Sequence, residues 1–408
     1  MTCAPTAATH PRLSARFAES HAEIWQAATV GAAEYWLGAL RRGAASPWHL
    51  ASDAARWLQA ATHRERPAWH SPHEIVLESP VARLRDFTDG ATDDVVPTLV
   101  LPPQAGHDSC IVDFSPVQSQ MRVIRAAGLT RAFSLDWIGA TPETRDATID
   151  DYLDFVERSI EHIGGPVNLV GDCQGGWLAT IYAALRPQHV HSLTIAGAPI
   201  DFHAGDAVIH DWVRCLTTAD LGFYRWVVQR GGGVLKGEHM LNGFILIKPE
   251  NEISKHVQLL ANLHDTEFVE RHRAFETWFK HVQDIPGAFY LWIVEHLFAG
   301  NELVGGELEI GGERVDLARI TCPVNLLAGE RDHITPPAQV FAAADHVGTP
   351  ATDIVTRVAP GGHLGLFMGS QALREHWPAL MAGVAARSGA DGRVRARTPR
   401  RRPAIPAP

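Results

Sequence analysis

The chain has 408 residues, of which 46% are hydrophobic and 20% are charged, and its formal net charge at pH 7 is -10. This composition supplies enough apolar side chains for a large buried core and excludes a chain that is mainly disordered. The acidic balance argues against nucleic acid as the main partner, because binding phosphate groups requires a basic surface.

The first residues and the cysteines predict a soluble, cytoplasmic protein. Residues 1–17 contain no continuous apolar stretch of the kind found in secretory signals. The most apolar window, residues 286–294, is much shorter than the roughly 20 residues that a membrane-spanning helix needs. The 5 cysteines are scattered and show no CxxC spacing, as expected for free thiols in a reducing compartment. We therefore expect no membrane span.

The order of predicted elements indicates an α/β architecture. Residues 1–72 are rich in Ala, Trp and His and predict an N-terminal helical segment, including a helix over 24–40. The apolar spacing over 149–163 predicts an amphipathic helix among the strands. Because strands alternate with helices, we expect a mostly parallel sheet. The predicted strands are the short β-prone runs 74–77, 97–101, 131–135, 167–170, 192–196, 323–327 and 353–358.

The same pattern predicts where the sheet is interrupted. The strand rhythm stops after residue 202 and resumes at 319, so the core comprises residues 73–202 and 319–387, with a large helical cap over 203–318. Residues 388–408 carry an Arg-rich run among Pro, Gly and Ala and predict a disordered basic tail. A solvated chain end explains this tail more simply than contact with nucleic acid or an anionic surface.

A cysteine follows the predicted strand at 167–170 in a pattern that predicts a nucleophile. Gly171-Asp172-Cys173-Gln174-Gly175-Gly176 matches the G-x-S-x-G nucleophile elbow of α/β hydrolases, with cysteine in place of serine. The elbow would place Cys173 at a helix N-terminus, where the helix dipole favours a thiolate. Alternatively, Cys173 is a small buried hydrophobic residue, as most free cysteines are.

An acid and a histidine follow later strands in the order that this fold requires. Asp332 comes after the strand at 323–327, and His363 comes after the strand at 353–358. Both lie just past strand C-termini, where open α/β sheets bind ligands. Alone, Asp332 would be a turn or helix cap and His363 a loop histidine. The order nucleophile, acid, histidine favours a catalytic triad of Cys173, Asp332 and His363.

The remaining polar groups of the site are predicted from the same elbow. The backbone N–H of Gln174 would supply half of an oxyanion hole. The other donor would come from the loop after 97–101, from Gln104 or Ala105, because the prolines that precede them cannot donate. There is no HExxH, Cys/His zinc spacing, Walker loop or GxGxxG after a strand, so we expect neither a metal nor a cofactor.

Together these motifs resemble the polyhydroxyalkanoate synthase family, most nearly its short-subunit class. The resemblance extends over about residues 70 to 385 and includes the cysteine elbow. It implies an α/β-hydrolase fold in which Cys173 carries the acyl chain as a thioester, His363 acts as base, Asp332 assists it and His333 contacts substrate. The further matching blocks are 135–137 (LDW), 149–152 (IDDY), 199–203 (PIDFH), 306–312 (GELEIGG), 315–317 (VDL) and 332–334 (DHI).

The resemblance also implies a substrate and partners for the protein, and it leaves alternative functions open. It implies (R)-3-hydroxyacyl-CoA as substrate, the polymer granule surface as a location, a second synthase subunit and a homo-oligomer. Gly106-His107, 136–138 and 197–201 instead resemble intracellular polyhydroxybutyrate depolymerases, which also use a cysteine nucleophile, whereas 306–317 and 332–333 resemble the synthase. A depolymerase or thioesterase, and a granule-binding protein with little turnover, are therefore alternatives to the acyltransferase. Exchange between thioesters favours the synthase.

Overall fold

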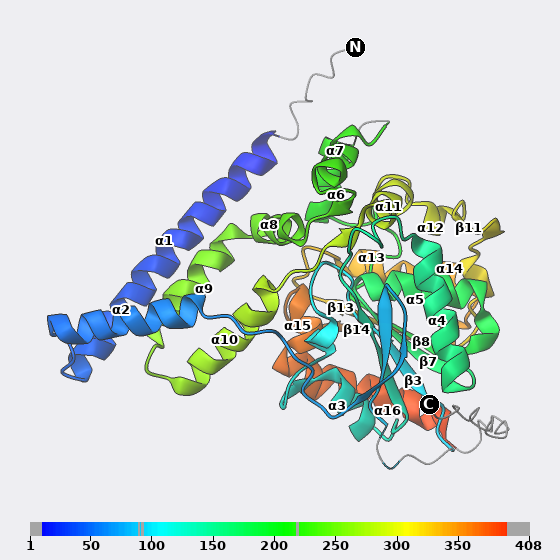
Figure 1. Cartoon of the computed structure of the whole chain (residues 1–408), viewed down its shortest axis with the longest axis horizontal. Coiled ribbons are helices and arrows are strands. Elements are labelled where there is room, and N and C mark those ends of the chain that lie inside the picture. Colours follow the sequence, from blue (N-terminus) through cyan, green and yellow to red (C-terminus); the bar gives the residue numbers. More distant parts are fainter. Residues whose placement is uncertain (1–9, 89, 91–93, 218–219, 390–408) are drawn as a thin grey trace, which may run out of the picture. The chain divides into compact units, whose positions relative to one another are not determined.

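In a computed structural model of the chain, residues 10–88, 90, 94–217 and 220–389 are described (Figure 1). The Arg-rich tail predicted to be disordered therefore lies, beyond residue 389, outside the described residues. The chain divides into two compact units. The first unit consists of Met1–Pro67 and Gly237–Val282, and the second consists of Ala68–Lys236 and Gln283–Pro408.

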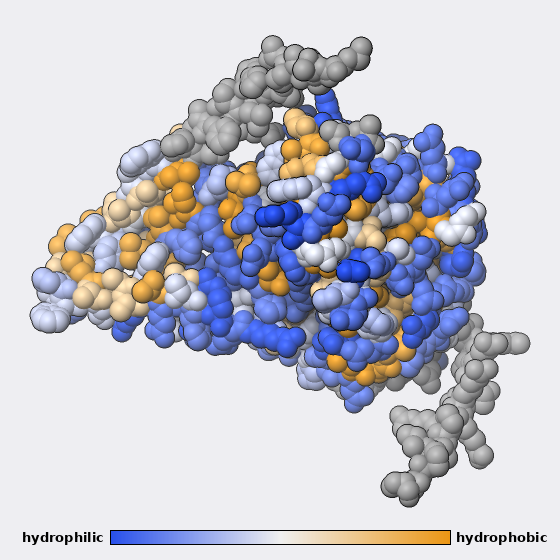
Figure 2. All heavy atoms as spheres, turned by 45° about the horizontal axis from the view of Figure 1, so that its top comes forward, coloured by the Kyte–Doolittle hydropathy of each residue, from blue (hydrophilic) through white to orange (hydrophobic). Residues whose placement is uncertain are grey.

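The first unit is helical. Helix α1 packs along α9, and Gly31 of α1 lies so close to α9 that an added Cβ would be 2.0 Å from Val257 Cγ1. Trp57 of α2 donates from Nε1 to the carbonyl of His256, 3.0 Å away. Apolar side chains also lie on the outside of this unit (Figure 2), where Trp25 is 68% and Trp48 87% exposed. Its helices are α1 His10–Arg41, α2 Pro47–Thr62, α8 Gly237–Ile247, α9 Pro249–Ala261 and α10 Thr266–Lys280.

The second unit is built on an 8-stranded sheet in the order β1-β2-β6-β3-β7-β8-β13-β14. Strand β2 pairs in antiparallel fashion with both of its neighbours, β1 and β6, and all the other pairs in the sheet are parallel. This order, with its antiparallel first hairpin, is that of an α/β-hydrolase sheet, as the sequence predicted. The strands are β1 Glu74–Glu78, β2 Ala82–Asp86, β3 Thr98–Leu101, β6 Ala132–Trp137, β7 Val167–Asp172, β8 Val190–Ala196, β13 Val324–Gly329 and β14 Ile354–Ala359.

Helices cover both faces of this sheet (Figure 1). The chain moves from β3 to β6 in one direction and from β6 through β7 to β8 in the other. Because parallel crossovers are right-handed, α3 lies on the face opposite to α4 and α5. Helix α3 packs against α16, and α5 packs on β7 and β8. The helices are α3 Gln120–Ala126, α4 Ile149–Ile163, α5 Gln174–Leu185, α13 Pro337–Phe341, α14 Ala343–His346, α15 His363–Met368 and α16 Trp377–Ser388.

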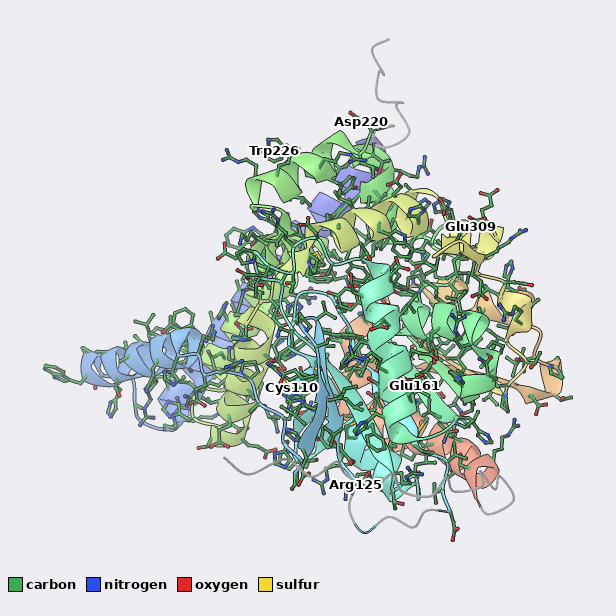
Figure 3. The ribbon with its side chains drawn as sticks, turned by 45° about the vertical axis from the view of Figure 1, so that its right-hand side comes forward. Cys110, Arg125, Glu161, Asp220, Trp226 and Glu309 are labelled. Carbon is green, nitrogen blue, oxygen red and sulfur yellow. The ribbon has the colours of Figure 1, made fainter. Side chains whose placement is uncertain are left out.

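The helical segment between β8 and β13 is divided between the two units. Residues 237–282 form part of the first unit, whereas the rest belongs with the sheet. The sequence pattern instead predicted a single cap over all of residues 203–318. In the second unit, α7 presents Trp226 at the surface, where it is 57% exposed (Figure 3). The second-unit elements of this segment are α6 Val208–Leu216, α7 Gly222–Arg230, β9 Val234–Leu235, β10 Ile285–Pro286, α11 Gly287–Trp292, the π-helix Ile293–Ala299 and α12 Glu302–Gly305.

None of the helices in the described ranges combines the length and the apolar character needed to cross a bilayer.

A buried polar side chain ties the last helix to the sheet. Asn168, on β7, donates from Nδ2 to Ser388 Oγ of α16, 2.9 Å away. Its Oδ1 accepts from Ser192 Oγ of β8 at 2.8 Å. All three side chains are almost fully buried. An unpaired buried polar group is costly, so each of these hydrogen bonds depends on the others.

Asn168→Ala is expected to lower the free energy of unfolding by about 2 to 3 kcal/mol, because it removes the buried acceptor of Ser192 Oγ and the hydrogen bond to Ser388 Oγ, which then bonds only the carbonyl of Val384. Chemical denaturation followed by fluorescence measures this loss. Ser192→Ala is the matched control and should cost less, since it removes one partner and leaves Asn168 bonded to Ser388. Equal stability of the Asn168 variant and the wild type would contradict this account.

Candidate active site

The site lies where the direction of the sheet reverses. The connection after β3 runs to one side and the connection after β7 to the other, although these strands are neighbours. Such a switch point opens a crevice at the carboxyl ends of the two strands, where ligands bind in open α/β sheets. The segments that leave β3 and β7 here are 102–107 and 173–174, which contain the predicted oxyanion donors and the predicted nucleophile.

Cys173 forms a strained turn between β7 and α5. Its backbone has φ 50° and ψ -121°, a left-handed conformation that non-glycine residues rarely adopt. The turn is held because Cys173 N donates to the carbonyl of Ala196 at 2.9 Å, and Gly176 N donates to the carbonyl of Cys173 at 2.9 Å. This is the geometry of a nucleophile elbow. Cys173 is 9% exposed, at the N-terminus of α5.

The glycines around Cys173 are needed because there is no room for side chains. A Cβ on Gly175 would lie 2.0 Å from the carbonyl oxygen of Leu101, and one on Gly171 would lie 2.5 Å from that of Gly175. A Cβ on Gly176 would lie 2.3 Å from the Ala198 Cβ. The start of α5 therefore packs directly against the end of β3 and the segment after β8. This close approach explains the glycine spacing that the sequence shows.

Gly175→Ala is expected to displace the elbow, since the backbone of β3 cannot move out of the way. We expect the variant to lose about 3 kcal/mol of stability from overpacking, and at least about 100-fold in activity from misplacement of Cys173. Gly383→Ala is the matched control, because Gly383 is an exposed position inside α16 with nothing within 4 Å of an added Cβ. Thermal unfolding and turnover measure both effects. Wild-type behaviour of both variants would contradict this close packing.

Asp332 and His363 meet from the ends of β13 and β14. His363 Nδ1 lies 2.7 Å from Asp332 Oδ2, and both side chains are buried. The other carboxylate oxygen of Asp332 accepts from the backbone N–H groups of Ile334 and Thr335, each at 2.9 Å. The acid is therefore fixed by the turn that follows its strand, and it orients the imidazole.

The second ring nitrogen of His363 faces Cys173. Nε2 is buried, and the side chain of Cys173 is close enough to interact with the imidazole. Burial lowers the pKa of His363, but the charge of Asp332 and, next, that of Cys173 outweigh burial and hold this pKa well above its usual range. A protonated imidazole beside a cysteine favours the reactive form of the thiol.

The predicted oxyanion donors and substrate contact lie at the same strand ends. Gln104 and Ala105 are buried in the segment after β3, and Gln174 is the first residue of α5. The contact between Gly175 and Leu101 brings that segment next to the elbow. His333 is exposed, and its backbone carbonyl accepts from Val208 N at 3.2 Å.

Aromatic side chains pack behind the elbow. Trp177, four residues after Cys173 on α5, lies with its ring centroid 6.2 Å from those of both Phe289 and Trp292. Tyr152 of α4 packs on Phe289 at 4.4 Å. These contacts form a buried aromatic cluster about one helical turn after Cys173 along α5.

Two polar residues beside the elbow escaped the sequence analysis. Asp172, directly before Cys173, is fully buried, and Gln120 of α3 donates to its Oδ1 at 3.3 Å. Burial raises the pKa of Asp172 to about 8, although the hydrogen bond from Gln120 and the charge of His363 lower it. An acid at the end of a mostly apolar strand, directly before the nucleophile, is the signal that could have identified Asp172.

One cluster of possible metal ligands occurs among the described residues, in the first unit. Glu252, His256 and Glu276 offer ligand atoms within 4.8 Å of one another. However, Lys255 Nζ lies 2.5 Å from a carboxylate oxygen of each glutamate, in the position that a cation would take. Since the lysine already balances the two acids, this cluster is an ion-pair network between α9 and α10.

Comparison with known proteins identifies the relatives of this chain. The model of a family described as "Protein of unknown function (DUF3141)" matches residues 77–385. The poly(3-hydroxyalkanoate) polymerase subunit PhaC of Haloferax mediterranei is 27% identical over 355 residues, covering 84% of this chain and 70% of that protein. The PhaC subunit of Allochromatium vinosum is 28% identical, covering 66% and 75%. The resemblance to polyhydroxyalkanoate synthases predicted from the sequence is thus confirmed.

Two solved structures are similar to this chain in the course of the backbone. The monoacylglycerol lipase of Paleococcus ferrophilus has a TM-score of 0.46 and 16% identity, covering 72% of this chain and 97% of the lipase. The epoxide hydrolase of Bacillus megaterium has a TM-score of 0.45 and 13% identity, covering 74% and 96%.

Proposed function

Because the chain belongs to the family described as proteins of unknown function (DUF3141) and is related to PhaC polymerase subunits, we propose that it is a cysteine-dependent acyltransferase. It would polymerise (R)-3-hydroxyacyl-CoA into polyhydroxyalkanoate. The proposal is supported above all by a cysteine on a strained elbow beside a buried His363–Asp332 pair, in a chain whose relatives are named polymerase subunits.

In the first step, Cys173 Sγ attacks the carbonyl carbon of the hydroxyacyl-CoA thioester. A new S–C bond forms as the bond to the CoA sulfur breaks, and the CoA thiolate takes a proton from His363. Asp332 holds the imidazole through Nδ1, so that Nε2 serves as the proton-transferring nitrogen. The product is a hydroxyacyl thioester on Cys173.

In the second step, a hydroxyl group attacks an acyl thioester. His363 accepts the hydroxyl proton, an ester bond forms, and the sulfur that held the acyl group leaves. The chain grows by one unit with each cycle. Because a water molecule could attack instead, the proposal requires that water is kept out of the site, and we assign this role to the aromatic cluster of Trp177, Phe289 and Trp292.

The oxyanion of each step needs hydrogen-bond donors. We assign one donor to the backbone N–H of Gln174, at the start of α5, and the other to Gln104 or Ala105 in the segment beside it. We assign substrate contact to the exposed side chain of His333. No metal or cofactor takes part in this chemistry; the CoA thioester is the substrate.

The proposal includes a setting in the cell. The protein would act in the cytoplasm at the surface of the growing polymer granule, as a homo-oligomer with a second synthase subunit. Short-subunit synthases, which the chain resembles, suggest these partners.

The test uses the purified protein with (R)-3-hydroxybutyryl-CoA, and follows free thiol and insoluble polymer in the same tube. Thiol release with a matching amount of polymer supports the synthase. Thiol release without polymer would overturn it in favour of a thioesterase. A third outcome is that no thiol is released, even when a purified second synthase subunit is present, while amorphous polymer granules are degraded. In that case the protein is a depolymerase.

A further inference from the structure

Asp172 is a buried acid that the triad chemistry does not use. Its side chain is 0% exposed, at the last position of β7 and directly before Cys173. Its Oδ1 accepts a hydrogen bond from Gln120 Nε2 at 3.3 Å, whereas Oδ2 is buried without a partner among the described residues. A carboxylate with one free oxygen in such a place is costly, but a protonated carboxyl group is not.

The groups that face Asp172 come from three elements. Gln120, at the start of α3, is uncharged, and its own Oε1 is also buried without a partner in the described chain. His363, at the start of α15, is close enough for its charge to act on the acid. Cys173 follows it in the chain, and Asp332 lies behind His363. A change in the charge of Asp172 is therefore felt by both members of the Cys173–His363 pair.

We propose that Asp172 is a positioning residue that sets the upper pH limit of the Cys173–His363 pair, being neutral when the site is reactive and inhibitory when ionised. This inference rests on the proposed function only in taking Cys173 as the nucleophile. An ionised Asp172 repels both the thiolate and the oxyanion formed from the substrate, because these negative charges would share one buried site. It also stabilises the proton on His363, which the imidazole must give up during turnover.

The pH at which this happens follows from the burial of the acid. Desolvation raises the pKa of Asp172 to about 8, more than the Gln120 hydrogen bond and the His363 charge lower it. The group is therefore expected to be mainly neutral well below about pH 8 and mainly charged well above it. The reactivity of Cys173 should therefore fall as the pH rises through about 8.

The test measures the reactivity of Cys173 directly, without substrate. Wild-type protein and Asp172→Asn are treated with iodoacetamide from pH 6 to 10, and alkylation of the Cys173 peptide is followed by mass spectrometry. Asparagine has the shape of the protonated acid but cannot ionise. We expect the alkylation rate of the wild type to contain a decrease centred near pH 8 that the variant lacks. At pH 7 the two rates should agree within about fivefold.

A second variant and a second readout keep the test decisive if asparagine perturbs the fold. Gln120→Met removes the hydrogen bond that lowers the pKa of Asp172, so the decrease should move to higher pH. The midpoint temperature of thermal unfolding should also change differently with pH in the wild type and in Asp172→Asn. The folded state holds a proton that the unfolded Asp172 releases, so wild-type stability falls relative to Asp172→Asn as the pH rises from about 4 to about 8.

The outcomes separate this inference from the proposed function. Identical pH profiles of Cys173 alkylation in all three proteins would overturn the role of Asp172, whatever the substrate. A loss of the decrease in Asp172→Asn supports it, even if the protein proves unable to make polymer. A uniform loss of reactivity at every pH would indicate a merely structural residue and would also overturn the inference.

Discussion

Cys173→Ala is expected to abolish both CoA release and polymer formation. Alanine keeps the small size of the side chain but removes the only atom that can form the thioester, so we expect a loss of at least about 10,000-fold. The residual rate is measured by thiol release from (R)-3-hydroxybutyryl-CoA. Thermal unfolding should be little changed, because cysteine at this position contributes little buried area.

The other thiols of the chain supply controls for this variant. Cys215 is exposed on α6, and Cys110 is buried in the short 3-10 helix Ser109–Val112 (Figure 3), where burial and the charge of Asp108 raise its pKa far above the usual range. Neither has a histidine partner comparable with that of Cys173. Cys215→Ala should therefore keep wild-type turnover. Full activity of Cys173→Ala would show that another residue is the nucleophile.

Asp332→Asn is expected to lower turnover by about 1,000- to 10,000-fold while leaving the fold intact. An asparagine can donate to Nδ1 of His363 and so favours the wrong tautomer, in which Nε2 carries the proton. The variant also lacks the negative charge that, against burial, raises the pKa of His363. The imidazole should therefore lose its proton at lower pH than in the wild type.

The titration of His363 by NMR checks the direction of that shift, and the pH profile of thiol release checks its effect. Asp345→Asn is the matched control, since Asp345 is an exposed acid on α14. An unchanged titration of His363 in Asp332→Asn would contradict the role assigned to the carboxylate.

The strands of the core were predictable because parallel strands are buried on both faces. The runs at 167–170 and 323–327 are apolar except for one asparagine each, Asn168 and Asn325, and they lie within β7 and overlap β13. Strand β2 escaped prediction. It contains Arg83 and Arg85, which break the apolar pattern, and Arg85 pairs with the buried Asp136 of β6 at 2.6 Å. Because Asp136 is far from Arg85 in the sequence, the pattern around β2 gives no sign that these charged residues belong to a strand.

The site was predictable in part for a similar reason. The glycines around Cys173 and the positions of Asp332 and His363 after strands are local signals, and the fold brings the strand ends together. The contact of Gln120 with Asp172 joins α3 to β7 and depends on tertiary packing. The pairing of residues 237–282 with the first helices likewise depends on long-range contacts, such as that of Trp57 with His256.

The most direct test of the central claim is the mass of the protein after brief exposure to (R)-3-hydroxybutyryl-CoA, followed by acid quenching and peptide mapping. The account predicts one or more hydroxybutyryl units on the peptide that contains Cys173, released by neutral hydroxylamine as a thioester should be. The Cys173→Ala protein should carry none. An acyl group on a different residue, or polymer formation with no acyl group on any cysteine, would contradict the claim that Cys173 carries the chain.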